Sequence, residues 1–130
     1  MAQEQLRTHK DLLLWQRSMR LAADVYRYAR TLPRHELIGL VTQLQRSAVS
    51  IPSNIAEGAG RRTTKEFLSF LYIARGSWAE LDTQLLLAHE LGYVNDEEMA
   101  HIRTSLDEVG RLLNSVIVAL RCRLNGGSYY

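Results

Sequence analysis

Arginines recur along one helical face in the N-terminal third of the chain, and their guanidinium groups are suited to binding anions. At 100° per residue they fall on one side of a helix, interrupted by Asp24. A guanidinium fork pairs with two phosphate oxygens, and a helical face about 25 Å long can follow a nucleic-acid backbone. The alternative is an ordinary solvent-exposed face. The arginines are Arg17, Arg20, Arg27, Arg30 and Arg34, and a second basic cluster consists of Arg61, Arg62 and Lys65.

A stripe of polar residues runs beside apolar positions between residues 36 and 59. Three interpretations of this stripe are open: a hydrogen-bonded network within the subunit, a subunit interface, or a ligand site. The first requires partners, because buried charges persist only when they are paired, and it predicts that Arg46 pairs with Glu57 or with Glu80. The polar positions are Gln43, Arg46, Ser50, Asn54 and Glu57.

Catalytic chemistry finds little support in the residue pattern. The four histidines lie in different segments without the Glu-x-x-His spacing of a di-metal helix bundle. Gly58-Ala59-Gly60-Arg61 follows a predicted helix and lacks the lysine of a phosphate-binding loop. We therefore expect no catalytic residue, no metal and no cofactor. The histidines are His9, His35, His89 and His101.

Four segments with apolar residues every three or four positions must position these groups. They span about residues 11–32, 36–59, 63–92 and 95–125, caps included, and short connections favour antiparallel neighbours. The prediction is an all-α, up-down-up-down four-helix bundle in a single domain, residues 1–130, with a loose arm at 1–9 and a short tail at 125–130. Pro52 should kink the second helix. Its buried stripe is Leu37, Leu40, Leu44, Ala48, Ile51 and Ile55.

Local signals mark the ends of the last two helices. Thr63 and Glu66 have the spacing of a capping box, and Asn95 precedes three acids at the start of the fourth helix. Gly92 should end the third helix, whereas Gly58-Ala59-Gly60 should cap the second.

Composition restricts the class of protein. The net charge of +2 is small, and the basic residues concentrate in the N-terminal third, whereas residues 63–130 are net acidic. No apolar run reaches the roughly 20 residues of a membrane helix. A single cysteine, Cys122, and the absence of a signal-peptide pattern predict a cytoplasmic protein.

Apolar residues outnumber the positions that one core of this size can bury, which predicts a homo-oligomer. The surplus residues are Ile38, Val41, Val49, Leu68, Tyr72, Ile73, Leu86, Leu87, Leu112, Ile117 and Val118.

Three stretches carry a resemblance to a known family: Ser50 to Gly58 (SIPSNIAEG), Leu14-Trp15, and Phe70 to Ser77 (FLYIARGS). From about residue 11 to 121 the chain resembles the four-helix-bundle family of bacterial 23S rRNA intervening-sequence proteins. The resemblance implies a homopentamer without catalytic residues. Relatives serve diversity-generating retroelements as accessory factors that bind nucleic acid and a reverse transcriptase. It also implies that Arg75 and Ser77, with Ser50, Asn54 and Glu57, hold the bundle and ring together.

These observations predict a non-enzymatic, self-assembling accessory or scaffold protein that binds RNA or DNA through its arginines. The alternative is a protein-interaction module with no nucleic-acid role.

Overall fold

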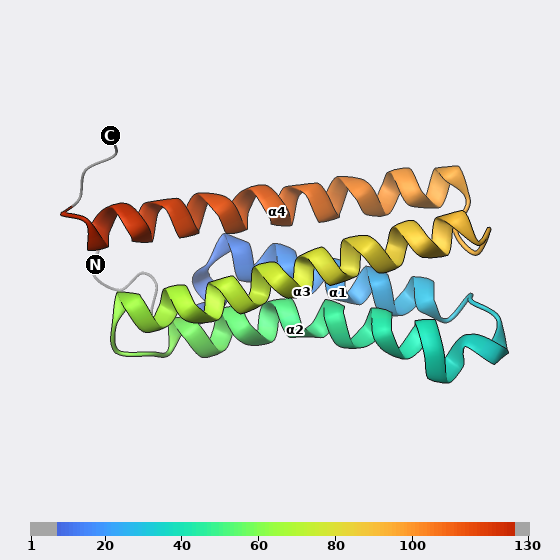
Figure 1. Ribbon diagram of the computed structural model, residues 1–130, viewed down its shortest axis with the longest axis horizontal. Helices are drawn as coiled ribbons and strands as arrows, with labels where there is room; N and C mark the ends of the chain where they lie inside the picture. Colours follow the sequence, from blue (N-terminus) through green and yellow to red (C-terminus); the bar gives the residue numbers. More distant parts are fainter. Residues whose placement is uncertain (1–7, 127–130) are drawn as a thin grey trace.

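The computed structural model describes residues 8–126, and this part of the chain is all-helical, without a strand (Figure 1). Its α-helices are α1 (Leu13–Ala29), α2 (Thr42–Ala59), α3 (Thr64–Glu90) and α4 (Asp96–Leu124). The predicted all-α class with four helices is confirmed. Most of the predicted N-terminal arm and tail, residues 1–7 and 127–130, lies outside the described residues.

Each helix packs on two others: α2 lies against α1 and α3, and α4 completes the arrangement by contacting both α3 and α1. The four long axes follow the length of the molecule, and successive connections lie at alternate ends (Figure 1). At one end, the hydroxyl of Tyr28 in α1 donates to the carbonyl oxygen of Tyr93, between α3 and α4, at 2.6 Å. The hydroxyl of Tyr93 donates to Glu36, just before α2, at 2.9 Å.

The core consists of the apolar stripes of the four helices. Leu44, Ile51 and Ile55 of α2 are fully buried among residues from the other three helices, as the spacing predicts. The same spacing also places Leu37 in the core, and this prediction is wrong because Leu37 is 61% exposed. Residues Leu37–Val41 form a π-helical turn, which winds the backbone more loosely and rotates these positions relative to an α-helical stripe.

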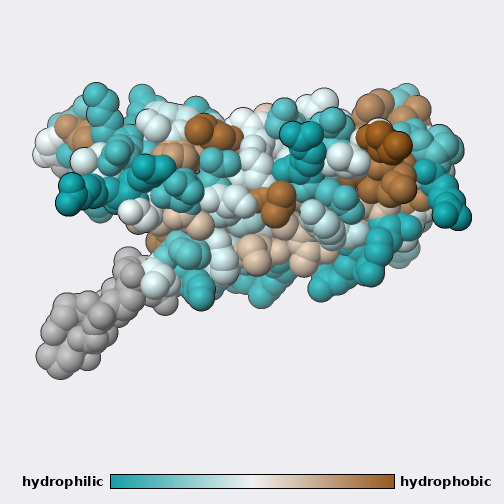
Figure 2. Space-filling view, turned by 90° about the horizontal axis from the view of Figure 1, so that it is seen from below, coloured by the Kyte–Doolittle hydropathy of each residue, from teal (hydrophilic) through white to brown (hydrophobic). Residues whose placement is uncertain are grey.

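Some residues that the sequence assigns to the apolar surplus are core residues. Val41, Leu68 and Ile117 are buried, whereas Ile38 is 88% exposed. Figure 2 shows hydrophobic surface at the end of the molecule that holds the connection between α1 and α2, where Leu37 and Ile38 lie. The fold therefore buries part of the predicted surplus and leaves the rest at the surface.

Local capping signals operate as predicted. Thr63 with Glu66 and Asn95 with Glu98 form complete capping boxes at the starts of α3 and α4. After α3, Gly92 has a φ of 82°, and the amide groups of Gly92 and Tyr93 return to the carbonyl oxygens of His89 and Ala88 at 3.0 and 2.9 Å. This is a Schellman motif, for which a residue without a Cβ atom is favoured.

Two sequence predictions concern α2: a cap at Gly58-Ala59-Gly60 and a kink at Pro52. Gly58 lies inside α2, where an added Cβ atom would stand 2.7 Å from Cβ of Phe70; the glycine therefore permits close packing of α2 on α3. Pro52 is buried, and α2 continues past it to Ala59. The kink at Pro52 stays a prediction.

Within residues 8–126, no helix combines the length and the apolar character that crossing a membrane requires. The cytoplasmic location stays a prediction.

Candidate nucleic-acid interface

The arginines of the N-terminal face differ in their availability. Arg20, Arg30 and Arg34 are exposed and form no ion pair within residues 8–126. Nη1 of Arg27 lies 2.9 Å from Oδ1 of Asp24. Nε of Arg17 lies 3.2 Å from Oε2 of Glu108 on α4, so Arg17 bridges two helices instead of facing solvent freely.

Acidic residues of α4 lie beside the C-terminal part of this arginine face. Arg27 lines a cavity of about 390 Å³ together with Asp24, Glu97 and Glu98. Burial raises the pKa of Tyr28 in the same cavity to about 12, and the charge of Glu98 contributes as the second cause. An anionic ligand on α1 would therefore meet carboxylates nearby.

The second predicted cluster lies just after the C-terminal end of α2. Arg34 precedes α2, whereas Arg61 and Arg62 follow it in the turn to α3, and Lys65 lies in the first turn of α3. Arg61 pairs with Glu57 at 2.6 Å, and its guanidinium carbon lies 4.8 Å from the ring centroid of Phe70. Arg34 and the second cluster therefore lie at opposite ends of α2.

Contacts between α3 and α4 show that these helices are antiparallel. Arg75 donates to Asn114 at 3.4 Å, Trp78 donates to the carbonyl oxygen of Leu106 at 2.7 Å, and the carboxylate of Asp82 lies 2.7 Å from Arg103. Residues later in α3 therefore contact residues earlier in α4. This register places the first half of α3 beside the last half of α4.

The antiparallel register collects basic residues at the end that holds the turn between α2 and α3. We call residues 57–79 and 109–126 the basic half. Its acids are Glu57, paired with Arg61, and Glu66, held in the capping box of α3. All of its basic side chains are exposed. They are Arg61, Arg62, Lys65, Arg75, Arg111, Arg121 and Arg123.

Sequence reasoning missed Arg111, Arg121 and Arg123 as members of this surface. A signal was present, because α4 contains no acid after Glu108 and α3 contains none between residues 67 and 79. Averaging the charge over residues 63–130 concealed this, since all acids of that stretch except Glu66 lie outside the basic half.

The comparison with known families decides which group the bundle belongs to. The model of the family described as 23S rRNA-intervening sequence protein matches residues 10–115. This chain belongs to that family.

A solved structure is also similar to this chain. It is a crystal structure of a protein of unknown function from the S23 ribosomal protein family of Bacteroides thetaiotaomicron, with a TM-score of 0.73 and 24% sequence identity. The match covers 81% of this chain and 98% of that chain. At this identity the likeness shows the fold alone. A comparison with functionally curated proteins gives no match.

Part of the predicted polar stripe joins α2 to α3. The hydroxyl oxygens of Ser50 and Ser77 lie 2.7 Å apart, and the amide nitrogen of Asn54 donates to Oγ of Ser50 at 3.0 Å and to its carbonyl oxygen at 2.8 Å. Ser47 donates to the side-chain oxygen of Gln84 at 2.7 Å. These bonds form an intramolecular network between the two helices.

The charged members of the stripe do not join that network. Glu57 pairs with Arg61, and Arg46 is exposed without an ion pair within residues 8–126, so the pairing of Arg46 with Glu57 or Glu80 is not formed. Gln43, Arg46 and Glu80 instead border an open polar cavity of about 320 Å³. The interface and ligand interpretations of these residues stay predictions.

The histidines are dispersed over the fold. His9 contacts the edge of Trp15, with ring centroids 5.1 Å apart, His35 lies near Tyr93, and His89 lies 2.7 Å from Asp96. Within residues 8–126, no three His, Cys, Asp or Glu side chains are grouped as metal ligands would be.

Proposed function

We propose that this member of the 23S rRNA-intervening sequence protein family is a non-enzymatic, self-assembling accessory or scaffold protein that binds RNA or DNA through its basic half. The proposal includes an antiparallel up-down-up-down bundle and, following the family resemblance, assembly into a homopentamer.

The observation that supports nucleic-acid binding is the separation of charge along the bundle. The basic half exposes arginines on the α2–α3 turn and on both α3 and α4, with few acids among them. Phosphate-backbone binding depends on such local accumulation of positive charge and on the release of counterions, so a net charge of +2 does not preclude it. The α1 arginines form a weaker candidate surface, because Arg17 and Arg27 are paired with acids.

Two matched triple variants test where binding occurs. Arg62→Gln, Arg121→Gln and Arg123→Gln together remove three charges from the basic half; Arg20→Gln, Arg30→Gln and Arg34→Gln together remove three from the N-terminal face. All six arginines are exposed and none forms an ion pair within residues 8–126. Because glutamine adds no negative charge, neither variant introduces repulsion at a helix end.

Fluorescence anisotropy of labelled structured RNA and duplex DNA, titrated with nuclease-treated protein over a salt series, provides the measurement. We expect wild-type affinity to fall linearly with salt on logarithmic axes. In the basic-half variant the slope should become shallower by about 0.9 for each phosphate that the protein no longer neutralises. The N-terminal variant should change the slope less. A larger change in the N-terminal variant would return the site to α1, and no binding by the wild type at low salt would end the proposal.

A protein-interaction module is the second candidate, and exposed apolar residues on α3 favour it. Tyr72, Ile73, Leu86 and Leu87 are each at least 40% exposed. For this candidate, affinity capture should enrich one protein partner, and nuclease treatment should leave the enrichment unchanged.

A further inference from the structure

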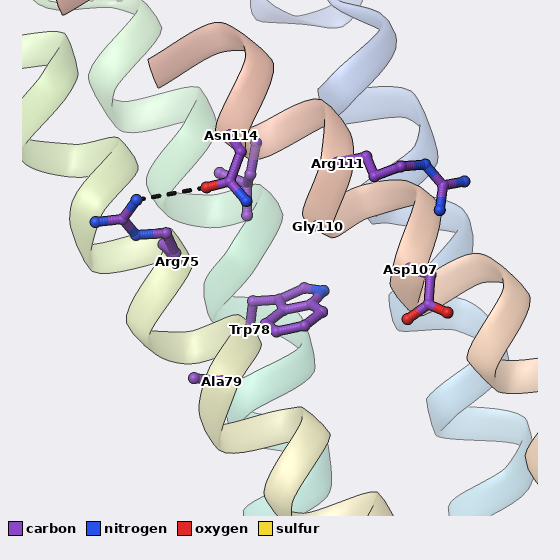
Figure 3. Close-up of a pocket in the computed structure, with 8 residues that line it drawn as sticks. Arg75, Trp78, Ala79, Asp107, Gly110, Arg111 and Asn114 are labelled. Atoms are coloured by element: carbon purple, nitrogen blue, oxygen red, sulfur yellow. Dashed lines mark hydrogen bonds between the residues drawn. The ribbon is translucent and has the colours of Figure 1, made fainter. Parts of the chain in front are cut away.

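A cavity of about 380 Å³ lies between α3 and α4, within and beside the basic half (Figure 3). Trp78 borders it from α3, and Gly110 borders it from α4. In Figure 3 the indole lies between the two helices, with Arg75 and Asn114 on one side and Arg111 and Asp107 on the other. The volume falls in the range of small-molecule sites.

The orientation of Trp78 is determined by contacts with α4. Its indole nitrogen donates to the carbonyl oxygen of Leu106 at 2.7 Å. Gly110 leaves room for the ring, because an added Cβ atom would lie 2.9 Å from Cζ2 of Trp78. The cavity therefore contains a half-buried aromatic surface whose position does not depend on a ligand.

The charges at the cavity are not balanced. Oδ1 of Asp107 lies 3.4 Å from Nη1 of Arg103, which also reaches Asp82, so the carboxylate of Asp107 already has a cationic partner. Among the described residues, Arg75 contacts only neutral groups, the amide of Asn114 at 3.4 Å and the ring of Tyr72 at 5.1 Å. Arg111 forms no ion pair within residues 8–126. Two guanidinium charges therefore lack acidic partners beside an aromatic surface.

We propose that this cavity binds one unpaired nucleotide, with the planar base against Trp78 and the phosphate contacted by Arg75 or Arg111. Base stacking on an aromatic ring and a charged hydrogen bond from arginine to phosphate are the two interactions that such a ligand offers. The amide of Asn114 supplies a donor and an acceptor for the edge of the base. The cavity is too small for a duplex, so it requires a nucleotide that is free or extruded from a strand.

This inference rests on the proposed function where the nucleotide belongs to a strand, and it stands alone where the nucleotide is free. The protein has two tryptophans, so Trp15→Phe makes Trp78 the sole indole reporter. Into this variant we would titrate adenosine monophosphate, uncharged adenosine, and a single-stranded oligonucleotide. We expect saturable quenching of Trp78 fluorescence, at least about tenfold tighter for the monophosphate than for the nucleoside, because the guanidinium groups interact with the phosphate.

Arg75→Gln tests the contribution of charge without removing the aromatic ring. It should weaken monophosphate binding about tenfold and leave nucleoside binding unchanged, whereas the matched control Arg20→Gln on α1 should change neither. Arg75 is exposed, so its replacement should leave the fold intact. An unchanged monophosphate affinity in Arg75→Gln, together with weakened binding in Arg111→Gln, would move the phosphate contact to Arg111. Unchanged affinities in both variants would overturn the site.

The source of the nucleotide follows from the pattern of responses. Quenching by the monophosphate supports a site for free nucleotide even if anisotropy shows no nucleic-acid binding, in which case the proposed function fails and the cavity site stands. Quenching by the oligonucleotide alone supports a strand as the source. If anisotropy shows nucleic-acid binding but Trp78 responds to no ligand, the cavity site is wrong and the proposed function stands.

Discussion

Tyr28 shows how one side chain joins distant parts of the chain. It is a buried residue of α1, and its hydroxyl reaches the backbone of Tyr93 in the connection between α3 and α4 at 2.6 Å. Burial, followed by the charge of Glu98, raises its pKa from 10.0 to about 12. The protonated phenol is therefore favoured in the folded state, and its ionisation should weaken the fold.

The first prediction concerns stability at alkaline pH. Because the folded-state pKa of Tyr28 is higher than the unfolded one, its contribution is fully present below pH 10.0 and is lost as the pH rises toward about 12. Tyr28→Phe should lower the free energy of unfolding by about 1 kcal/mol near neutral pH. Urea unfolding followed by circular dichroism should show this difference decreasing above pH 10.0.

Tyr26→Phe is the matched control, because Tyr26 lies on the exposed side of α1 and makes no hydrogen bond through its hydroxyl within residues 8–126. It should leave the free energy of unfolding unchanged. A Tyr28→Phe difference that stays constant across the alkaline range would contradict the linkage argument.

At the scale of the helices, the close packing of α2 on α3 depends on residues from both. Both helices present small or polar groups where they meet: Gly58 lies against Phe67 and Phe70, and Ser50 bonds with Ser77. Gly58, Ser50 and Ser77 permit a short distance between the two helices, since a larger side chain at any of these positions would force the helix axes apart. The proximity therefore depends on both helices at once.

The second prediction tests this packing. Gly58→Ala should destabilise the protein by about 1–3 kcal/mol, because the added methyl group overlaps Cβ of Phe70 at 2.7 Å and the helix backbones must shift. Gly60→Ala is the control: Gly60 has a φ of −84° and an added Cβ atom meets its nearest neighbours at 3.6 Å. It should stabilise by about 0.4–1 kcal/mol through the unfolded state. Thermal or urea unfolding of both variants measures the two effects, and equal effects would rule out the packing role of Gly58.

At the scale of the whole molecule, one side of α3 exposes apolar residues to solvent in the part of the chain that the structure describes. Tyr72, Ile73, Leu86 and Leu87 recur on this outer face, with the small residue Gly76 between them. An added Cβ atom at Gly76 would meet nothing within 4 Å. Apolar helix faces of this kind are commonly covered by another chain, and the proposed self-assembly supplies a second copy.

The third prediction is that Ile73→Lys and Leu87→Lys together abolish self-assembly while helical content is retained, because two charges would be buried in the interface. Analytical ultracentrifugation should give a multiple of 14.9 kDa for the wild type and 14.9 kDa for the variant. Val118→Lys, on the exposed side of α4, should leave the oligomer unchanged. A monomeric wild type would remove self-assembly from the proposal.

The sequence by itself determined the helices and their ends. The capping boxes at Thr63 and Asn95 and the stop at Gly92 depend on groups within a few residues of one another. The buried stripe from Leu44 to Ile55 follows from the helical period alone. Leu37 is exposed instead of buried, because a π-helical turn changes the rotation of its segment. Periodicity and capping are local, so they can be read from a single chain.

Only the tertiary structure decided which surfaces result. The position of Arg75 relative to Arg111 and the cavity at Trp78 depend on the antiparallel register of α3 and α4, and the Ser50–Ser77 bond depends on the distance between α2 and α3. The ion pairs Arg17–Glu108 and Arg103–Asp82 join different helices, so they too depend on which side chains can reach each other once the helices are packed. Register between helices is set by interdigitation of many side chains, which spacing along one segment does not encode.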